Sequence, residues 1–480
     1  MKVSASPLDA MELSRRRWLQ FSGSTLAAAL GATGLSALLP ATAQAQTGYR
    51  ALVCIFLYGG NDGCNMVVPT DTTRYGQYSG VRGSLALPRA SLVNLTGTDY
   101  GLHPALSALS GAWADRKLAP VFNVGPLNRP LTKAEFRSLP ETDVRIPQSL
   151  FSHSDQQVLW ESASSTVVER TGWGGRASAT LGTVNPVISV GGNGRFGLSA
   201  LQTPLVLPEP GGTFGLNGLT DPTWAPEVER KRALEALYAG GDSNTMVNAF
   251  MAQQRSAFDM SARLGALVAL QPGAVAGSLL DAAFAPITTN GRINTPIGRQ
   301  LYQVAKLVEG RATVQGNRQI FFAQQGGYDT HSDQIAGTSL EGDHARLLKA
   351  LGDAMACFYN AMKALGLSES VTLFTQSDFG RTFKPNSSNG TDHAWGNHHL
   401  VLGGSVVGGT TYGAYPELVL GGPDDVGQQS WELHGRWIPK LGVDQYAATL
   451  LRWMGASDAQ LNSILPNLPN YGSNRSVGFL

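Results

Sequence analysis

Short, continuously apolar runs recur along the chain and alternate with stretches in which apolar residues follow helical spacing. The first run, at 51–58, is typical of a strand that is covered on both faces of a mostly parallel sheet. Similar runs follow at 119–124, 187–190, 319–324, 371–375 and 399–402. Between them, leucines at helical spacing predict helices at 104–116 and 341–365. The pattern predicts an α/β fold, with a mostly parallel sheet flanked by helices.

The middle of the chain, about 192–310, departs from this alternation. It begins with a Gly- and Pro-rich stretch, and helical patterns follow at 225–239, 243–264 and 296–309. We interpret it as a helical insertion or cap. The apolar runs account for a single sheet, so residues 46–480 are predicted to form one domain. This domain would be larger than the typical length of about 150 residues.

The first 45 residues are predicted to be an export signal rather than part of the fold. The motif Ser-Arg-Arg-Arg-Trp-Leu-Gln at 14–20 precedes an apolar, Ala- and Gly-rich run, and together they resemble a twin-arginine signal. Small residues ending at Ala45 favour cleavage there, which leaves no stable membrane span. The export machinery is then a partner, and the mature protein is periplasmic or secreted. The alternative is a membrane anchor, because the run of about 19 residues approaches the ~20 needed to span.

Charge and cysteine content narrow the possible partners. Lys and Arg number 36 against 35 Asp and Glu, without a long basic run, so neither a nucleic acid nor a polybasic membrane contact is predicted. The 3 cysteines show no CxxC spacing, which argues against a disulfide framework and a thiolate zinc site. A Cys54–Cys64 bridge remains open in an oxidising compartment.

The candidate chemistry lies where predicted strands end. Asp62, Asp329 and Asp378 each follow a strand, and ligands of open α/β sheets bind beyond the carboxyl ends of strands. His331 lies two residues after Asp329, so in an extended segment both side chains point the same way. Clustered Asp and His without Cys predict one or two divalent ions: Zn, Mn, Mg or Ca. The structural alternative for Asn61-Asp62-Gly63 is an ordinary turn.

Three further histidines lie within 392–399, just ahead of a predicted strand. His393 is either a ligand or part of a surface loop. Adjacent residues entering a strand point to opposite faces, so at most one of His398 and His399 is expected to bind metal, and we predict His398. His331 and His398 are both expected to be ligands rather than packed core residues, because their flanking residues are Gly, Asp or Asn.

Ser152, or alternatively Ser154, opens a predicted helix at 151–160, and Ser152 is the candidate for chemistry. Its hydroxyl is either a helix cap, with Asp155 three positions later approximating a capping box, or a nucleophile. Free N–H groups at a helix start hold anions, and a nearby divalent ion activates a hydroxyl. The two roles are compatible.

Taken together and in this order, several motifs resemble those of an exported bacterial family, domain of unknown function 1501, over nearly all of 47–480. They are GGNDG, the Ser-His at a helix start, TGWGGR, GGYDTH, SDFGRT and DHAWGNHH. The resemblance implies the alkaline phosphatase and sulfatase superfamily, with its α/β core and, usually, two divalent metals. It also implies transfer of phosphoryl or sulfuryl groups through a Ser, Thr or modified Cys.

The resemblance implies a role for each matching residue. Asp62 would be the first-strand metal ligand, Ser152 the nucleophile, and Asp329 with His331 one metal site. Asp378 would belong to the superfamily's Asp-His pair, and His393 or His398 would be the late histidine. Two positions depart from the superfamily pattern: Phe379 replaces the His of the pair, and the spacing from Asp329 to His331 is shorter than usual.

Two functions are therefore expected. One is an exported, metal-dependent hydrolase of a small anionic phosphate or sulfate ester, in which Ser152 attacks and Arg381 clamps the anion. The other is an exported binding or assembly protein that keeps the scaffold without turnover. For either function, the strands at 319–324 and 371–375 are predicted to lie beside the first strand, bringing Asp62, Asp329 and Asp378 to one rim.

Overall fold

The computed structural model of the chain describes residues 48–480, apart from 216–217, 220–222 and 428–431. The predicted twin-arginine signal at 1–45 lies outside the described residues. Within these residues, none of the helices combines the length and the apolar character required to cross a membrane. Cys54, Cys64 and Cys357 are all free and buried, so the Cys54–Cys64 bridge left open by the sequence does not form.

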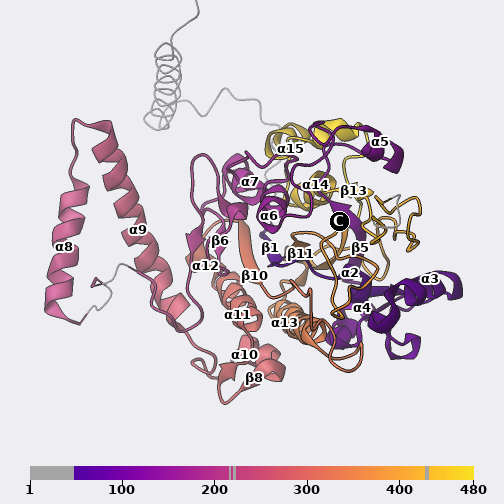
Figure 1. Cartoon of the computed structure of the whole chain (residues 1–480). Helices are drawn as coiled ribbons and strands as arrows, with labels where there is room; N and C mark the ends of the chain where they lie inside the picture. The colour runs from indigo at the N-terminus through magenta and orange to yellow at the C-terminus, as the bar shows by residue number, and fades with distance from the viewer. Residues whose placement is uncertain (1–47, 216–217, 220–222, 428–431) are drawn as a thin grey trace, which may run out of the picture. The chain divides into compact units, whose positions relative to one another are not determined.

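An 8-stranded mixed sheet forms the centre of the fold, in the order β13-β5-β12-β11-β1-β10-β6-β7 (Figure 1). Its strands are β1 (Arg50–Leu57), β5 (Leu118–Gly125), β6 (Ile188–Ser189), β7 (Leu205–Val206), β10 (Arg318–Gln325), β11 (Val371–Ser377), β12 (Asn397–Gly403) and β13 (Leu441–Gly442). Only β12 runs antiparallel to its neighbours. Every apolar run identified in the sequence is a strand of this sheet, which confirms the predicted mostly parallel α/β architecture.

Two small sheets accompany the large one. Their strands are β2 (Val67–Pro69), β3 (Val93–Asn94) and β4 (Tyr100–Leu102) in one, and β8 (Thr288–Thr289) and β9 (Arg292–Ile293) in the other. The helices are α2 (Gly63–Met66), α3 (Thr72–Arg82), α4 (Ser110–Ala114), α5 (Lys133–Ser138), α6 (His153–Ser162), α7 (Trp173–Leu181), α8 (Ala225–Ala239), α9 (Thr245–Ala269), α10 (Leu279–Phe284), α11 (Pro296–Glu309), α12 (Arg311–Val314), α13 (Asp343–Ala364), α14 (Val443–Trp453) and α15 (Asp458–Ile464). The helix predicted at 341–365 is α13, whereas the one predicted at 104–116 is a 3-10 helix, Pro104–Leu109, followed by α4.

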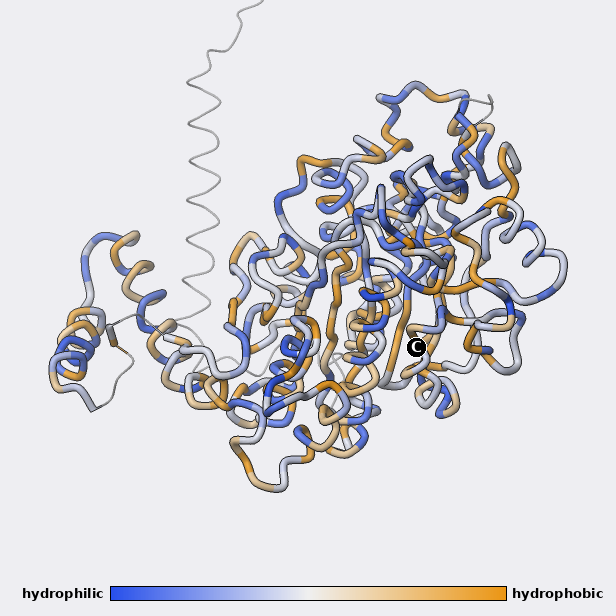
Figure 2. Tube along the Cα trace, turned by 60° about the horizontal axis from the view of Figure 1, so that its bottom comes forward, coloured by the Kyte–Doolittle hydropathy of each residue, from blue (hydrophilic) through white to orange (hydrophobic). Residues whose placement is uncertain are grey.

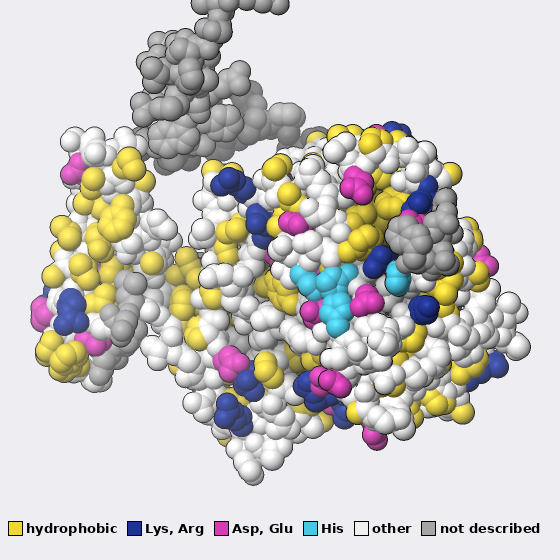
Figure 3. All heavy atoms as spheres, viewed as in Figure 1, with side chains coloured by type: hydrophobic (Ala, Val, Ile, Leu, Met, Phe, Trp, Pro, Cys, Tyr) yellow, Lys and Arg dark blue, Asp and Glu magenta, His cyan; other side chains and the backbone are white. Residues whose placement is uncertain are grey.

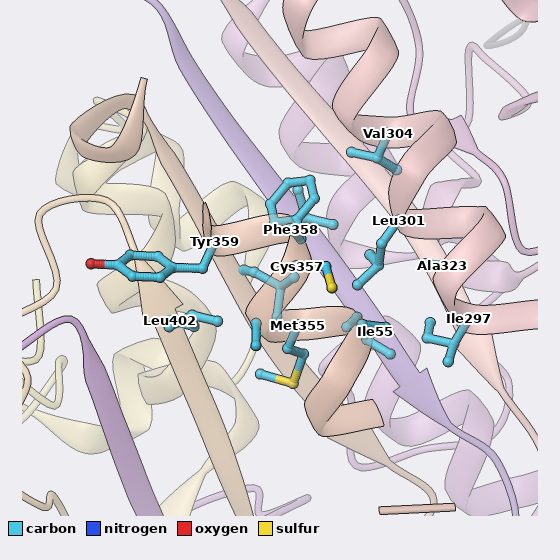
Figure 4. Packing of buried hydrophobic residues seen from close by; sticks show 14 of the residues in the cluster. Ile55, Ile297, Leu301, Val304, Ala323, Met355, Cys357, Phe358, Tyr359 and Leu402 are labelled. Atoms are coloured by element: carbon cyan, nitrogen blue, oxygen red, sulfur yellow. The ribbon is translucent and has the colours of Figure 1, made fainter. Parts of the chain in front are cut away.

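Alternate residues of β1 enter two different hydrophobic clusters, as period-2 geometry requires. Val53 and Ile55 pack with the apolar faces of α10, α11 and α13. Cys54 and Phe56 pack on the other face with α6, α7, α14 and α15. Figure 2 shows the hydrophobic residues concentrated along the central strands, and Figure 4 shows side chains of α11 and α13 meeting Ile55 of β1. Helices on both sheet faces explain why the strand sequences are continuously apolar.

The helices of the segment predicted as an insertion or cap, about 192–310, pack in two different ways. Helices α8 and α9 pack on each other, and the end of α9 packs on α11 and α12. Helix α11, by contrast, packs directly on β10 and α13 and is almost wholly buried, so it belongs to the helical layer of the sheet. The Nζ atom of Lys306 in α11 donates to the carbonyl oxygens of Leu267 and Val268 at the end of α9, at 3.0 and 3.1 Å. This contact joins the end of α9 to α11.

Strands β11, β1 and β10 are neighbours, which confirms the predicted strand adjacency. Leu57 at the end of β1 is in register with Gln325 of β10 and with Ser377 of β11. Because the three strands are parallel, the segments that follow them leave the same edge of the sheet. That edge carries Asp329 and Asp378.

Candidate metal centre

Three histidine side chains converge on one carboxylate oxygen at this edge of the sheet. The Nε2 atoms of His153, His331 and His393 lie 3.2, 3.1 and 3.4 Å from Oδ1 of Asp329. The ligand atoms of His153, Asp329 and His393 all lie within 4.8 Å of one another, close enough to share one ion. Nε2 of His331 lies 2.8 Å from Nε2 of His393. We call these four side chains the histidine group.

The members of the histidine group come from three distant segments of the chain. His153 is the first residue of α6, Asp329 and His331 follow β10, and His393 lies between β11 and β12. The backbone of Asp329 packs directly on Gly59, whose φ of +110° and lack of a Cβ allow the close approach. The glycine after β1 therefore admits the Asp329 segment to the site.

Each imidazole is held through its other nitrogen. Nδ1 of His153 lies 2.7 Å from Oδ2 of Asp378, and Nδ1 of His331 lies 2.9 Å from Oδ1 of Asp392. Nδ1 of His393 lies 2.6 Å from the carbonyl oxygen of Phe151. An ionised carboxylate and a carbonyl only accept, so each Nδ1 carries the donated proton, and a neutral ring then presents an Nε2 lone pair to the centre. Histidines that bind metals in proteins typically donate their other ring N–H to a carboxylate or carbonyl in this way.

The electrostatics of the group favour an ionised Asp329. Burial raises the pKa of its carboxyl, but Arg381 and the neighbouring histidines outweigh burial and bring this pKa to about 2. The hydrogen bond to Asp378 raises the pKa of His153, whereas burial lowers the pKa of His393. Asp329 is thus a carboxylate over the whole physiological pH range.

A family model described as "Protein of unknown function (DUF1501)" matches residues 49–464. The chain belongs to the DUF1501 family. No curated protein matches the chain. Similar solved structures include two of Ps i-CgsB, one of them in complex with k-i-k-neocarrahexaose. They are 9% and 10% identical to this DUF1501 chain, cover 88% of it and 77% of their own chains, and have TM-scores of 0.35 and 0.34.

Asp378 of the DUF1501 chain lies behind His153 rather than in the centre. It is fully buried and accepts hydrogen bonds from the Gly59 N–H and from Nε2 of Gln157, at 3.2 and 2.9 Å, besides its contact with His153. In this position it orients an imidazole, whereas the sequence analysis expected a metal ligand. The ring of Phe379 packs against His153 and His393, with centroid distances of 4.7 and 4.5 Å.

Arg381 is also committed to the protein interior. Its buried guanidinium donates to the carbonyl oxygens of Gly60 and Thr391, both at 2.9 Å, and to Oδ1 of Asp329 at 2.6 Å. The contact with Asp329 holds the carboxylate in place. A guanidinium with all three nitrogens engaged in this way is not available to clamp an anion, so the expected role of Arg381 is replaced by one of positioning Asp329.

The structure does not bring Asp62 into the histidine group. Asp62 is fully buried and forms an ion pair with Arg82 of α3, and Nε2 of Gln334 donates to the same carboxylate oxygen. Burial raises the pKa of Asp62, but Arg82 outweighs it and the net shift is downward. The positive charge that the sequence analysis expected from a metal ion is supplied at Asp62 by an arginine.

His398 lies in the hydrophobic core, whereas the sequence predicted a metal ligand rather than a packed core residue. Its ring stacks on Trp437 at a centroid distance of 5.3 Å, and its Nδ1 accepts from the Asn123 N–H at 3.1 Å. Burial lowers the pKa of His398 to about 3, so the ring is neutral. His399 is equally buried, against Trp160 at 4.7 Å. The sequence signal from flanking polar residues was misleading because aromatic rings from distant segments enclose both histidines.

Ser152 immediately precedes His153 and is half-buried. It occupies the N-cap position of α6 without a capping hydrogen bond from its side chain, so the capping alternative is not realised. Its Oγ lies 3.3 Å from Oγ of Ser154. Ser152 therefore stands at a helix start, directly before His153 of the histidine group in the chain.

The group is open to solvent. The side chains of His331 and Asp329 are 44% and 49% exposed, and Figure 3 shows histidine side chains gathered on one face of this DUF1501 chain. Sequence reasoning missed His153 as a member. The available signal was its position directly after Ser152 in the Ser-His motif, which also opens α6.

Proposed function

We propose that this DUF1501 protein binds a divalent metal ion at the histidine group and hydrolyses a small phosphate or sulfate ester. The proposal rests on one observation. The Nε2 atoms of His153, His331 and His393 all lie within 3.4 Å of the same oxygen of Asp329, and the Nδ1 atom of each ring contacts a hydrogen-bond acceptor. A metal ion between the imidazole nitrogens and the carboxylate would relieve the repulsion between their lone pairs. The donor set thus fits a metal ion.

Three imidazole nitrogens and one carboxylate oxygen favour a borderline ion such as Zn²⁺ over Mn²⁺, Mg²⁺ or Ca²⁺, which prefer oxygen ligands. We propose one ion, because Asp62 and His398 do not join the group and only one such cluster is found in the described part of the chain. When bound, the ion supplies Lewis-acid charge to an anionic ester.

The chain's own residues supply the remaining parts of such a reaction. Ser152 Oγ is the proposed nucleophile, and the start of α6 presents free backbone N–H groups that favour an anionic group beside it. Asp378 holds His153, Asp392 holds His331, and Arg381 holds Asp329, so the ligand side chains are fixed before substrate binds. We propose that export by the twin-arginine machinery places this activity in the periplasm or outside the cell.

Membership of the alkaline phosphatase and sulfatase superfamily is part of this proposal. The superfamily's Asp-His pair is interrupted here by Phe379, yet His153 of α6 lies beside Asp378. A histidine from another segment thus occupies the neighbourhood of that Asp. This replacement supports retention of a metal site despite the change in sequence.

The second candidate function is an exported binding or assembly protein in which the ion has a structural role only. The engagement of Arg381 with Asp329 and backbone carbonyls favours it, because no clamp for a substrate anion remains on that side chain. A closed, fully ligated site without turnover would identify this function.

Elemental analysis of the purified mature protein tests the metal centre. We expect about one divalent ion per chain in the wild type, a loss in His153→Ala and His393→Ala, and no change in the control His434→Ala, which lies outside the histidine group. A screen of phosphate monoesters, diesters and sulfate esters, with Ser152→Ala as comparison, then separates the two functions. Metal binding without turnover of any ester would select the binding protein, and absence of metal from the wild type would overturn both.

A further inference from the structure

A cavity of about 390 Å³ lies beside the histidine group, within the size range of small-molecule sites. It is formed by α5 and by the segment that leads into α6. Its apolar lining comprises Phe136, Leu139, Ile146, Pro147, Leu150 and Phe151. We infer that this cavity binds the apolar organic group, an aromatic ring or branched alkyl chain, of the ester whose anionic group lies at the metal; the inference rests on the proposed function.

Phe151 belongs to both sites. It lines the cavity, while its carbonyl oxygen lies 2.6 Å from Nδ1 of His393. The ring of Phe136, another lining residue, packs on Trp395, two residues after His393, at a centroid distance of 5.5 Å. Figure 3 shows hydrophobic side chains gathered next to the exposed histidines. One substrate can therefore place an anionic group at the histidine group and an apolar group in the cavity.

The shared wall is held in an unusual conformation. Ser149 and Phe151 have φ values of +50° and +74°, in the left-handed region that residues other than glycine seldom adopt. The guanidinium of Arg436 covers the Phe151 ring at 4.6 Å from its centroid, and Nε of Arg436 donates to the His393 carbonyl oxygen at 2.8 Å. Strain of this kind persists where the surroundings fix it, and here Arg436 links the Phe151 ring to the His393 carbonyl.

The charges around the cavity argue for a neutral occupant. The cation in its lining, Arg137, forms an ion pair with Glu432 at 3.2 Å, and the lining acid Glu141 is exposed. A sugar would require several buried hydrogen-bonding groups, whereas this lining is mainly aromatic and aliphatic. A larger cavity of about 760 Å³ lies against α9, but its lining contains no titratable side chain.

Phosphonates test the inference without turnover, because their carbon–phosphorus bond is not hydrolysed. We expect metal-loaded wild type to bind phenylphosphonate about 10- to 100-fold more tightly than methylphosphonate in calorimetry, the factor expected for burying one ring. Leu139→Trp fills the cavity and should abolish this preference while leaving methylphosphonate binding unchanged. Val144→Trp is the matched control, since Val144 lies in the same segment, is 73% exposed and does not line the cavity.

Should Leu139→Trp fail to fold, Leu139→Ala keeps the inference testable, because the enlarged cavity should shift preference from phenylphosphonate toward 1-naphthylphosphonate. Equal affinity of wild type for the phenyl and methyl compounds, or a preference that survives in folded, metal-loaded Leu139→Trp, would overturn the cavity assignment. Turnover is scored separately with benzyl and methyl phosphates. Preference for phenylphosphonate without turnover of either phosphate refutes the proposed hydrolase but supports the cavity assignment. Turnover with equal affinity for the two phosphonates supports the hydrolase but refutes the cavity assignment. Failure of both compounds to bind overturns both.

Discussion

Replacing Asp378 by Asn should weaken metal binding without removing any metal ligand. The Asp378 carboxylate accepts from His153 Nδ1 at 2.7 Å, from Gln157 Nε2 at 2.9 Å and from the Gly59 N–H at 3.2 Å. An asparagine has one acceptor oxygen in place of two, so it cannot satisfy all three donors. Where its NH₂ group faces His153, the ring is driven to the tautomer that carries its proton on Nε2, and the lone pair that should bind metal is lost.

The magnitude follows from the role of Asp378 behind a ligand. Removing such an orienting carboxylate costs about 10- to 100-fold in metal affinity, or roughly 1.4 to 2.7 kcal/mol. Asp378 is fully buried, so water cannot replace the lost acceptor, and the loss should lie at the upper end of this range. Asp392→Asn is the graded comparison. Its carboxylate is 36% exposed behind the more open His331, and it should give a smaller loss.

The assay is competition of the protein with a fluorescent chelator for Zn²⁺ and Mn²⁺, at a pH where wild type is stable. Thermal melting in excess chelator is measured in parallel, to show that each variant is folded without metal. The reasoning is refuted if folded Asp378→Asn binds metal as tightly as wild type. It is also refuted if Asp392→Asn loses clearly more affinity than Asp378→Asn, because burial would then not determine the effect.

The remaining predictions concern the core and the signal. His398→Ala should lower the unfolding free energy by about 2 to 4 kcal/mol, equally with and without chelator, and should keep the metal content of wild type. A loss of stability that depends on chelator would show that His398 is a metal ligand after all. Arg82→Met should cost about 3 to 5 kcal/mol in urea unfolding, because Asp62 is left buried and unpaired, and adding Asp62→Asn should recover part of the loss. Burial raises the pKa of Asp444 to about 7, so its carboxyl stays protonated in the folded state where the unfolded chain ionises. The stability of wild type relative to Asp444→Asn, measured in chelator, should therefore fall by up to about 4 kcal/mol from pH 4 to 7, and an unchanged difference would contradict this. Replacing the first two of the three arginines of the predicted signal, Arg15→Lys and Arg16→Lys, should retain the precursor in the cytoplasm, and normal amounts in the periplasm would contradict the twin-arginine assignment.

The strands and the adjacency of β11, β1 and β10 could be predicted from the sequence, because both depend on local pattern. A strand buried on both faces must be apolar along its whole length, and parallel strands joined by helices present their carboxyl ends at one edge. The same reasoning placed Asp329, His331 and His393 in segments near that edge. It predicted where a site would lie but not which residues form it.

Tertiary packing decided which side chains form the histidine group. His153 is distant in sequence from Asp329 and joins it because α6 begins beside the ends of β10 and β11. Asp62 has the same local surroundings as a ligand, yet Arg82 arrives from α3 and neutralises it, and Trp437 covers His398 from a segment far along the chain. Apolar periodicity records only which face of one element is buried. Whether a polar side chain meets a metal, an arginine or an aromatic ring depends on distances of about 3 to 5 Å between elements, and these are set only when the whole core packs.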